Sequence, residues 1–267
     1  MRLGYINYLN CFPFYYHMFH VKPLEDVEVV PAYPSQLNEM IKSGALHMSP
    51  ISSAAYAQAQ EDLQLLPQFC LSSVGYVRSV ILASKKPIED LDGCTIGLSS
   101  ASQTSVVLLK ILMQTFYALT PQYVESDPYV ALKDLDAKLV IGNEAMMHEK
   151  EPLPYIYDLG DLWLKKTGHP VVFAVFAVRK DSSCYDTIDA VCASYRASLD
   201  ELAKNPGAVI QKARQRYPNI AYDIAHYYTL LKFEFTEELK RALMYYYTMA
   251  AKLGLLPQVP SLQLYGR

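Results

Sequence analysis

Short apolar runs alternate with amphipathic stretches along the first part of the chain. The runs are "RLGYIN", "VEVVPA" and "LHMSPI", and residues with helical spacing follow at about 13–20, 34–43 and 53–60. This alternation of strand and helix predicts an α/β lobe with a largely parallel sheet. Pro34 is typical of a helix start, and Gly44 is typical of the residue that ends a helix.

A second series of the same kind follows. "CTIGLSS" leads into an apolar-periodic helix at 103–117, and "AKLVIGN" leads into a short helix at 143–149. After the apolar run "PVVFAVFAV" the pattern becomes helical to the end of the chain. The helices expected in this C-terminal tail lie at 184–204, 206–216, 219–232 and 235–253.

Two apolar strands, at about 77–84 and 171–178, are long enough to cross between two lobes. Two crossings form a hinge, and a hinge creates a cleft. We therefore predict a discontinuous lobe one, made of residues 1–84 plus 175–267, and a lobe two made of residues 85–174.

Composition and charge narrow the range of partners. The chain has 267 residues, 51% of them apolar, and a formal charge of −3, with its Lys and Arg residues scattered rather than gathered on one face. We expect no nucleic acid partner, because phosphate binding needs a basic face. No apolar run reaches the roughly 18 residues of a membrane span, so no membrane is expected either.

The cysteines and the N-terminal pattern favour the cytoplasm. Five cysteines without CxxC spacing are typical of reduced thiols rather than of a disulfide framework. Met1 is followed at once by strand-like positions, so we expect no export signal.

Polar clusters follow three of the predicted strands. In open α/β sheets, ligands bind beyond the carboxyl ends of the strands, where helix N-termini present free N–H groups. Each cluster alone also suits a helix cap, but three at one expected cleft favour a site for a carboxylate. The candidate ligand-binding residues are Tyr8, Ser52, Ser53, Ser100, Ser102, Thr104 and Ser105.

The stretch "YVRSVILAS" carries two further candidates. Alternation along a strand places Arg78 and Ser79 on opposite faces, so only one of them can face the cleft unless a bulge intervenes. Arg78 would be a bidentate carboxylate donor and Ser79 a neutral one. The choice stays open, and a surface ion pair is the alternative role for Arg78.

Other chemistry has little support in the sequence. His17 and His20 share a helix face, but no third ligand has suitable spacing, so we expect no metal site. The chain has no Gly-rich phosphate loop, and neither GxSxG nor HExxH occurs. The 22 tyrosines, among them the pair Tyr227 and Tyr228, are expected to pack helix faces with solvated hydroxyls. Asp158 reads most simply as a charge at a helix N-terminus.

Six segments together resemble the chorismate dehydratase family of the futalosine route to menaquinone. They are "INYLN", "YPSQLNEMIKSGALHMSPISSAAYA", "SVGYVRSVILAS", "GLSSASQTSVVLLKILM", "LVIGNEAM" and "YDLGDLWLKKTGHPVVFAVFAVR", which span residues 1–180. The resemblance implies a two-lobe, type II periplasmic-binding-protein-like fold that is used as an enzyme. The related 1,4-dihydroxy-6-naphthoate synthase shares this fold but opens with a "CPND"-like segment where this chain has "NYLN", so the dehydratase is favoured.

The resemblance also implies a reaction and its residues. Water is removed from chorismate, a dianion, to give 3-[(1-carboxyvinyl)oxy]benzoate, with neither metal nor organic cofactor. Asn10 and Ser79 are the catalytic candidates, because an amide or a hydroxyl can donate to a substrate carboxylate or to the departing hydroxyl. Asn143 occupies the position at which the "IGD" form of the motif carries Asp. Whether Asn143 binds the substrate is therefore open.

Several alternatives remain at this stage. The general base is expected to be the enolpyruvyl carboxylate of the substrate, with an Asp, Glu or His of lobe two as the competing explanation. A non-catalytic solute-binding protein and a ligand-sensing effector domain would use the same fold. The oligomeric state cannot be read from this pattern.

Overall fold

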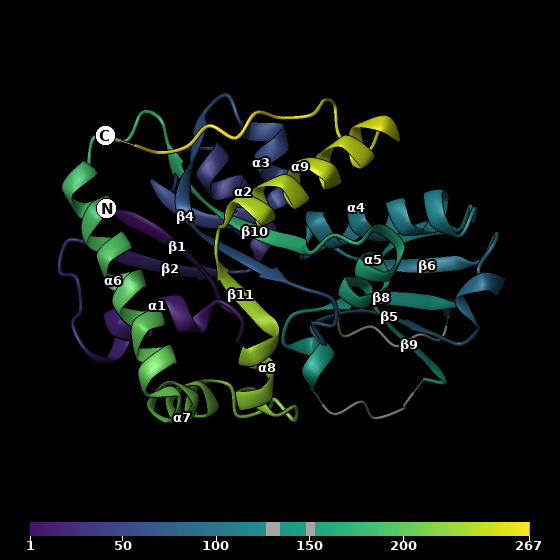
Figure 1. The fold of residues 1–267 in the computed structure, drawn as a ribbon, viewed down its shortest axis with the longest axis horizontal. Helices are drawn as coiled ribbons and strands as arrows, with labels where there is room; N and C mark the ends of the chain where they lie inside the picture. Colours follow the sequence, from purple (N-terminus) through teal and green to yellow (C-terminus); the bar gives the residue numbers. More distant parts are fainter. Residues whose placement is uncertain (127–133, 148–152, 267) are drawn as a thin grey trace.

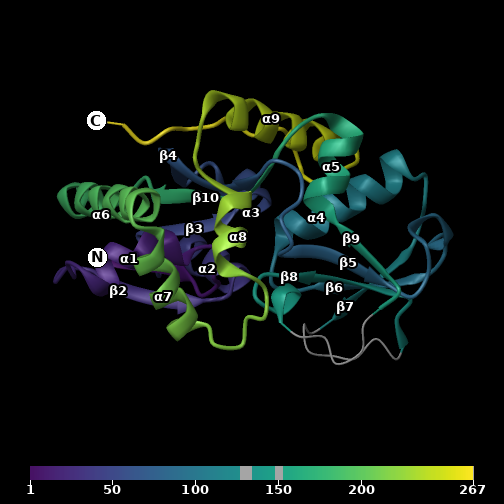
Figure 2. The same ribbon diagram turned by 60° about the horizontal axis from the view of Figure 1, so that its bottom comes forward.

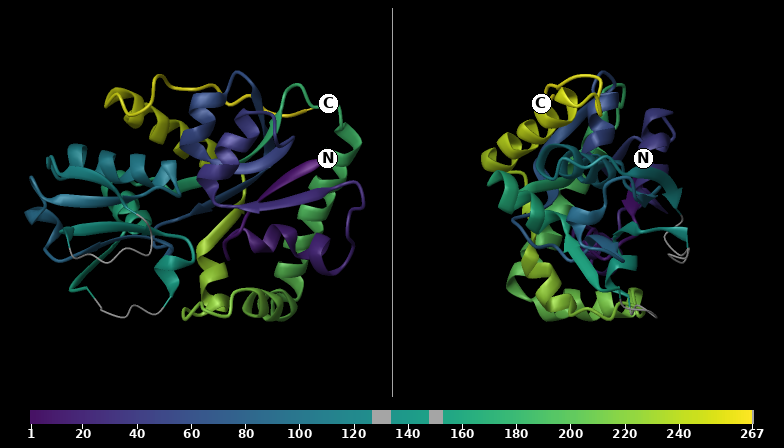
Figure 3. Two further views of the ribbon diagram at one scale, coloured as in Figure 1. Left: turned by 180° about the vertical axis from the view of Figure 1, so that it is seen from behind. Right: turned by 90° about the vertical axis from the view of Figure 1, so that its right-hand side faces the viewer.

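Two lobes, each built on one mixed sheet, lie side by side in the computed structural model, which describes residues 1–126, 134–147 and 153–266 (Figure 1). Both chain ends lie on the lobe that holds the first sheet (Figure 3). No helix of the described ranges is long and apolar enough to span a membrane.

The first sheet has the strand order β11-β4-β10-β3-β1-β2. Its strands are β1 (Arg2–Ile6), β2 (Glu28–Ala32), β3 (Met48–Ser52), β4 (Leu63–Ser73), β10 (Val171–Arg179) and β11 (Leu231–Glu234). β1 pairs in parallel with β2 and β3, whereas β10 runs antiparallel to β3 and β4. The expectation of a largely parallel sheet was therefore wrong, because the returning strand β10 enters the middle of the sheet in the opposite direction.

Helices that surround the first sheet begin close to the predicted positions. They are α1 (Phe12–His20), α2 (Pro34–Lys42), α3 (Ser53–Ala59), α6 (Tyr185–Lys204), α7 (Pro206–Arg216), α8 (Ile224–Leu230) and α9 (Glu237–Lys252). Gly44 follows α2 with φ +78°, a left-handed conformation that glycine adopts without strain, as the sequence predicts. Beneath α1 and α6, the rings of Phe14, Phe69, Phe176 and Tyr195 pack with centroids 4.4 to 6.2 Å apart.

The second sheet has the order β7-β6-β8-β5-β9. Its elements are β5 (Val80–Ser84), β6 (Thr95–Ser99), β7 (Gln122–Ser126), β8 (Ala137–Ile141), β9 (Tyr155–Asp158), α4 (Gln103–Ile111) and α5 (Leu159–Thr167). The helix expected at 103–117 continues past α4 as a π-helical turn at Leu112–Phe116. The helix expected at 143–149 is a 3-10 turn at Glu144–Met146, and its last two positions lie outside the described residues.

The tail departs from the predicted all-helical pattern at one point. α8 ends at Leu230, and the next residues form β11, which pairs with β4. The expectation of a helix through 219–232 was wrong because the exposed edge of β4 offers backbone partners that a local pattern does not reveal. α9 then crosses from the first lobe to the second (Figure 2). Trp163 of α5 packs there against Tyr245 and Tyr246.

The strands expected to cross between the lobes each belong to one sheet. β5 pairs with β8 and β9, and β10 pairs with β3 and β4. The chain passes between the sheets at residues 74–79 and again between α5 and β10. We therefore propose lobe boundaries at these two connections, which would place β5 in lobe two and the whole of β10 in lobe one.

Asp158 holds the first connection in place. Its carboxylate accepts hydrogen bonds from the backbone N–H groups of Val77, at 3.1 Å, and Arg78, at 2.6 Å. It also caps α5 by accepting from the N–H of Asp161 at 3.0 Å. Arg78 has φ +65°, which is costly for a residue with a side chain, so this connection needs such an anchor.

Asp158→Ala should lower the free energy of unfolding by about 1–3 kcal/mol, because it leaves buried N–H groups without an acceptor and removes a helix cap. Urea denaturation measures the loss. The control is Asp161→Ala, whose carboxylate pairs with the exposed Lys165 and should cost less than about 1 kcal/mol. Equal losses in the two variants would contradict the anchoring role of Asp158.

Candidate active site

A small cavity lies between the lobes. We call it the inner cavity; its lining residues are Ile6, Tyr8, Asn10, Pro34, Ser52, Leu71, Val77, Ser79, Val80, Ser102, Ser105, Ile141, Gly142, Phe173, Ala174 and Leu231. Its volume is about 40 Å³, far below the several hundred Å³ of ordinary ligand pockets. A ring with two carboxylates does not fit this space, so its entry would require the lobes to separate.

The inner cavity brings together residues from all three predicted polar clusters. Asn10 follows β1, Ser52 ends β3, and Ser102 with Ser105 begins α4. Tyr8 and Ser79 complete the set of predicted residues that line it. No described residue of the lining carries a charged side chain, so the donors available to a ligand are neutral.

Asn10 and Ser79 meet at one phenol. The Tyr227 hydroxyl donates to Ser79 Oγ at 2.8 Å, and the Asn10 side chain lies near enough to lower the pKa of this phenol, against the larger effect of burial. Asn10 Oδ1 is buried without a protein partner. Burial raises the pKa of Tyr227 well above its usual value, so the phenol stays protonated.

The α4 N-terminus adds donors to the same cavity. Ser102 caps the helix by accepting from the Ser105 N–H at 3.3 Å, and the two hydroxyl oxygens lie 3.1 Å apart. The first turn of an α-helix carries free N–H groups and a partial positive charge, which stabilise an anion. This arrangement agrees with the predicted carboxylate cradle, although the roles of both serines remain predictions.

Other predicted residues are engaged elsewhere. The Ser53 hydroxyl donates to the Val172 carbonyl at 2.7 Å, and Thr104 Oγ1 accepts from the Ala54 N–H at 3.1 Å. Ser100 is exposed and does not line the inner cavity. Arg78 and Ser79 were expected on opposite faces of a strand, but both precede β5, which begins at Val80. Ser79 lines the cavity, whereas Arg78 lies over the Tyr222 ring at 5.7 Å.

Asn143 connects the second lobe to the loop that carries Asn10. Its Oδ1 accepts from the buried Leu9 N–H at 2.8 Å. The preceding Gly142 has φ +64°, and a Cβ there would lie 2.6 Å from the Tyr8 ring. Only glycine lets the two lobes approach this closely, so the position of Tyr8 depends on Gly142 as well as on its own loop.

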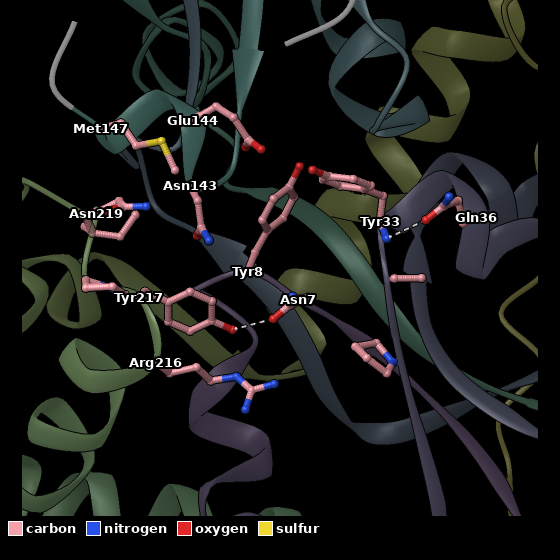
Figure 4. A pocket seen from close by; sticks show the side chains of 14 residues that line it. Asn7, Tyr8, Tyr33, Gln36, Asn143, Glu144, Met147, Arg216, Tyr217 and Asn219 are labelled. Atoms are coloured by element: carbon pink, nitrogen blue, oxygen red, sulfur yellow. Dashed lines mark hydrogen bonds between the residues drawn. The ribbon is translucent and has the colours of Figure 1, made fainter. Parts of the chain in front are cut away.

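A larger outer pocket of about 580 Å³ adjoins the inner cavity, and Tyr8 lines both. Figure 4 shows Asn7, Tyr33, Gln36, Glu144 and Tyr217 gathered with Tyr8 and Asn143 around it, from both lobes and the tail. Arg216 also lines this pocket, and its guanidinium lies over the Tyr5 ring at 5.1 Å. Tyr8 therefore forms the boundary that the outer pocket shares with the inner cavity.

The sequence did not predict that the C-terminal tail contributes to both the inner cavity and the outer pocket. Leu231 lines the inner cavity, Tyr227 contacts its lining residue Ser79, and Arg216 and Tyr217 line the outer pocket. No motif in this part of the chain marks them. The large number of tyrosines was the available signal, but it does not distinguish packing from function.

The described residues include no group of three or more His, Cys, Asp and Glu side chains that could hold a metal ion. His17 and His20, which share a helix face, make contacts of another kind. His17 Nδ1 lies 3.2 Å from Ser194 Oγ, and His20 packs against Phe12.

Two α/β lobes around a small uncharged cavity define the class of periplasmic-binding-protein-like folds. A crystal structure of an Archaeoglobus fulgidus protein superimposes with a TM-score of 0.76 at 22% identity, over 95% of this chain and 97% of that one. The periplasmic aliphatic sulphonate binding protein SsuA from Escherichia coli superimposes with a TM-score of 0.72 at 15% identity, over 100% and 92% of the chains. These neighbours confirm the predicted fold.

Sequence similarity then identifies the family. The family described as "Menaquinone biosynthesis" matches residues 1–252, and the chain belongs to it. The chain is 32% identical to a chorismate dehydratase from Thermus thermophilus over 197 residues, 67% of this chain and 70% of that protein. It is 23% identical to a 1,4-dihydroxy-6-naphtoate synthase from the same organism, over 97% of both proteins. The resemblance to this family is thereby confirmed.

Asn143→Ala should lower the free energy of unfolding by about 1–3 kcal/mol, because the buried Leu9 N–H loses its acceptor. Asn143→Asp keeps an oxygen at this position and should remain within about 1 kcal/mol of the wild type. Urea denaturation of both variants tests the assignment. An Asp variant as unstable as the Ala variant would contradict the role of the side chain as an acceptor.

Proposed function

We propose that this protein is a chorismate dehydratase, a hydro-lyase of menaquinone biosynthesis that needs no metal or organic cofactor. The observation that carries the proposal is the meeting of Asn10 and Ser79 at one uncharged cavity between the lobes. The similarity to a relative named chorismate dehydratase supports it. All five cysteines are free thiols, which supports action in the reducing cytoplasm.

The reaction breaks the C4–O and C3–H bonds of chorismate, and the hydroxyl and the proton leave together as one water. The ring becomes aromatic, which supplies the driving force. The remaining task for the protein is to hold a dianion in the eliminating geometry and to exclude water, and a closing cleft suits that task.

The uncharged lining affects which group can act as the general base. A lysine or arginine beside the substrate carboxylate would lower its basicity, whereas neutral donors orient the carboxylate and leave it able to accept a proton. We therefore propose that the enolpyruvyl carboxylate takes the C3 proton and passes it to the departing C4 hydroxyl, which leaves as water and restores the carboxylate. The Ser102 and Ser105 hydroxyls, with the α4 N-terminus, would bind the other carboxylate.

Asp158 is one lobe-two carboxylate that would compete for the role of base. It does not line the inner cavity, and both of its oxygens accept backbone N–H groups. Burial raises its pKa, and these N–H bonds oppose the rise. A carboxylate held in this way supports the hinge rather than proton transfer.

Asn10 and Ser79 would act on the departing hydroxyl. The Asn10 Oδ1 without a protein partner can accept from this hydroxyl, and the Ser79 hydroxyl can donate to its oxygen. An aspartate at position 10 would repel both substrate carboxylates, which accounts for an amide in this loop.

A second candidate is 1,4-dihydroxy-6-naphthoate synthase activity. The relative of that name matches 97% of this chain, a larger share than the chorismate dehydratase does. The opening "NYLN" and the higher identity favour the dehydratase. Incubation with the cyclic futalosine substrate of the synthase separates the two.

Purified protein mixed with chorismate in metal-chelating buffer should yield an aromatic product lighter by one water, followed by liquid chromatography with mass detection. Asn10→Ala should reduce kcat/KM by about 10²–10³, as removal of one transition-state hydrogen bond does in other enzymes. The control is Asn219→Ala, an exposed asparagine of the outer pocket, which should stay close to the wild type.

Two other outcomes would contradict this proposal. Tight binding of chorismate without turnover would indicate a solute-binding protein. Turnover of the cyclic futalosine substrate, with chorismate unchanged, would indicate the synthase.

A chorismate analogue that lacks the enolpyruvyl carboxylate should still bind, yet react at least about 10²-fold more slowly, because it lacks the proposed base. Single-turnover kinetics measure the chemical step apart from binding. A rate comparable to that of chorismate would exclude the substrate carboxylate as the base.

A further inference from the structure

Tyr227 is the one tail side chain whose described contacts include both catalytic candidates. It lies on α8, it is fully buried, and its hydroxyl meets Ser79 and Asn10. It does not itself line the inner cavity, so it reaches the ligand space only through these two residues. A buried hydroxyl beside two functional candidates suggests a role beyond filling the core.

The hydrogen bonds have a direction. Asn10 lies near the Tyr227 oxygen, its Oδ1 has no hydrogen-bond partner, and its amide N–H₂ group is the donor that it offers there. Tyr227 then donates its single proton to Ser79 Oγ. Within the described residues, the Ser79 proton meets no protein acceptor, and Ser79 lines the inner cavity. The chain of donors therefore ends with a proton available to a ligand.

The contact also joins separate parts of the fold. α8 packs beside β11 of the first sheet, whereas Ser79 immediately precedes β5 of the second, and its carbonyl accepts from the Gly142 N–H at 2.7 Å. The Tyr227 hydroxyl thus bridges the tail and the second lobe. Its hydrogen bond to Ser79 depends on the closeness of the lobes.

We propose that Tyr227 is a positioning residue for the dehydration, an inference that rests on the proposed function. By donating to Ser79 Oγ it orients the serine so that the Ser79 proton points into the inner cavity, toward the departing C4 hydroxyl. This orientation is complete only when the lobes are closed, which links the donor geometry to closure of the cleft.

Tyr227→Phe should reduce kcat for chorismate about tenfold, the rate equivalent of one lost hydrogen bond, and leave KM within about twofold. The matched control is Tyr195→Phe, another fully buried tyrosine that donates to a hydroxyl, that of Tyr15 at 2.6 Å. The control loses the same kind of bond away from the cavity, so its kcat and KM should stay at the wild-type values.

A double-mutant cycle separates positioning from direct action. In a Ser79→Ala background, Tyr227→Phe should change kcat by no more than about twofold, because Tyr227 acts through the serine. The two substitutions should also be non-additive in urea denaturation, a readout that needs no turnover.

The outcomes distinguish this inference from the function on which it rests. An unchanged kcat in Tyr227→Phe, or the same tenfold loss in the Ser79→Ala background, would overturn the positioning role alone. Additive effects of the two substitutions on the free energy of unfolding would contradict an energetic contact between Tyr227 and Ser79. A wild-type protein that converts no chorismate would overturn both the proposed function and the role of Tyr227 in it.

Discussion

The hydrogen bond from the Leu9 N–H to the Asn143 oxygen joins the two lobes at the loop that carries Asn10. A buried N–H without an acceptor is costly, so this contact favours the closed arrangement. Gly142, beside Asn143, lets the second lobe approach the Tyr8 ring. The Thr104 bond to Ala54 and the Tyr227 bond to Ser79 add further links across the cleft. The inner cavity exists because these links bring neutral donors from both lobes to one place.

The uncharged lining decides which chemistry this cleft favours. Binding proteins often hold anions with charged side chains, which bind a carboxylate strongly but also reduce its basicity. Here the cavity offers serine hydroxyls, an amide and the start of α4 instead, and we propose that these bind the substrate carboxylates. A dianion held in this way keeps a carboxylate able to accept a proton. The same binding fold could thereby support an elimination without any titratable protein group at the reacting carbon.

Local pattern predicted much of the fold because each signal depends on a few neighbouring residues. Pro34 begins α2 and Gly44 follows its end, and the strands β1, β3 and β6 precede the three polar clusters. Other elements depended on distant partners. The strand β11 forms in a segment with helical pattern because the edge of β4 is available, and β5 pairs within the second sheet rather than crossing between the lobes.

The sequence by itself determined the two-lobe α/β fold, which follows from periodicity, and the family resemblance, which follows from short motifs and implies the candidates Asn10 and Ser79. Only the tertiary structure decided which candidates share a cavity. Ser52, Ser102 and Ser105 line it, whereas the Ser53 and Thr104 side chains form hydrogen bonds with backbone groups. The sequence does not show which of several neighbouring polar residues will face the cavity. The place of Tyr227 depended on the fold of the tail, which lies about 150 residues from Ser79 in the chain and meets it only through packing.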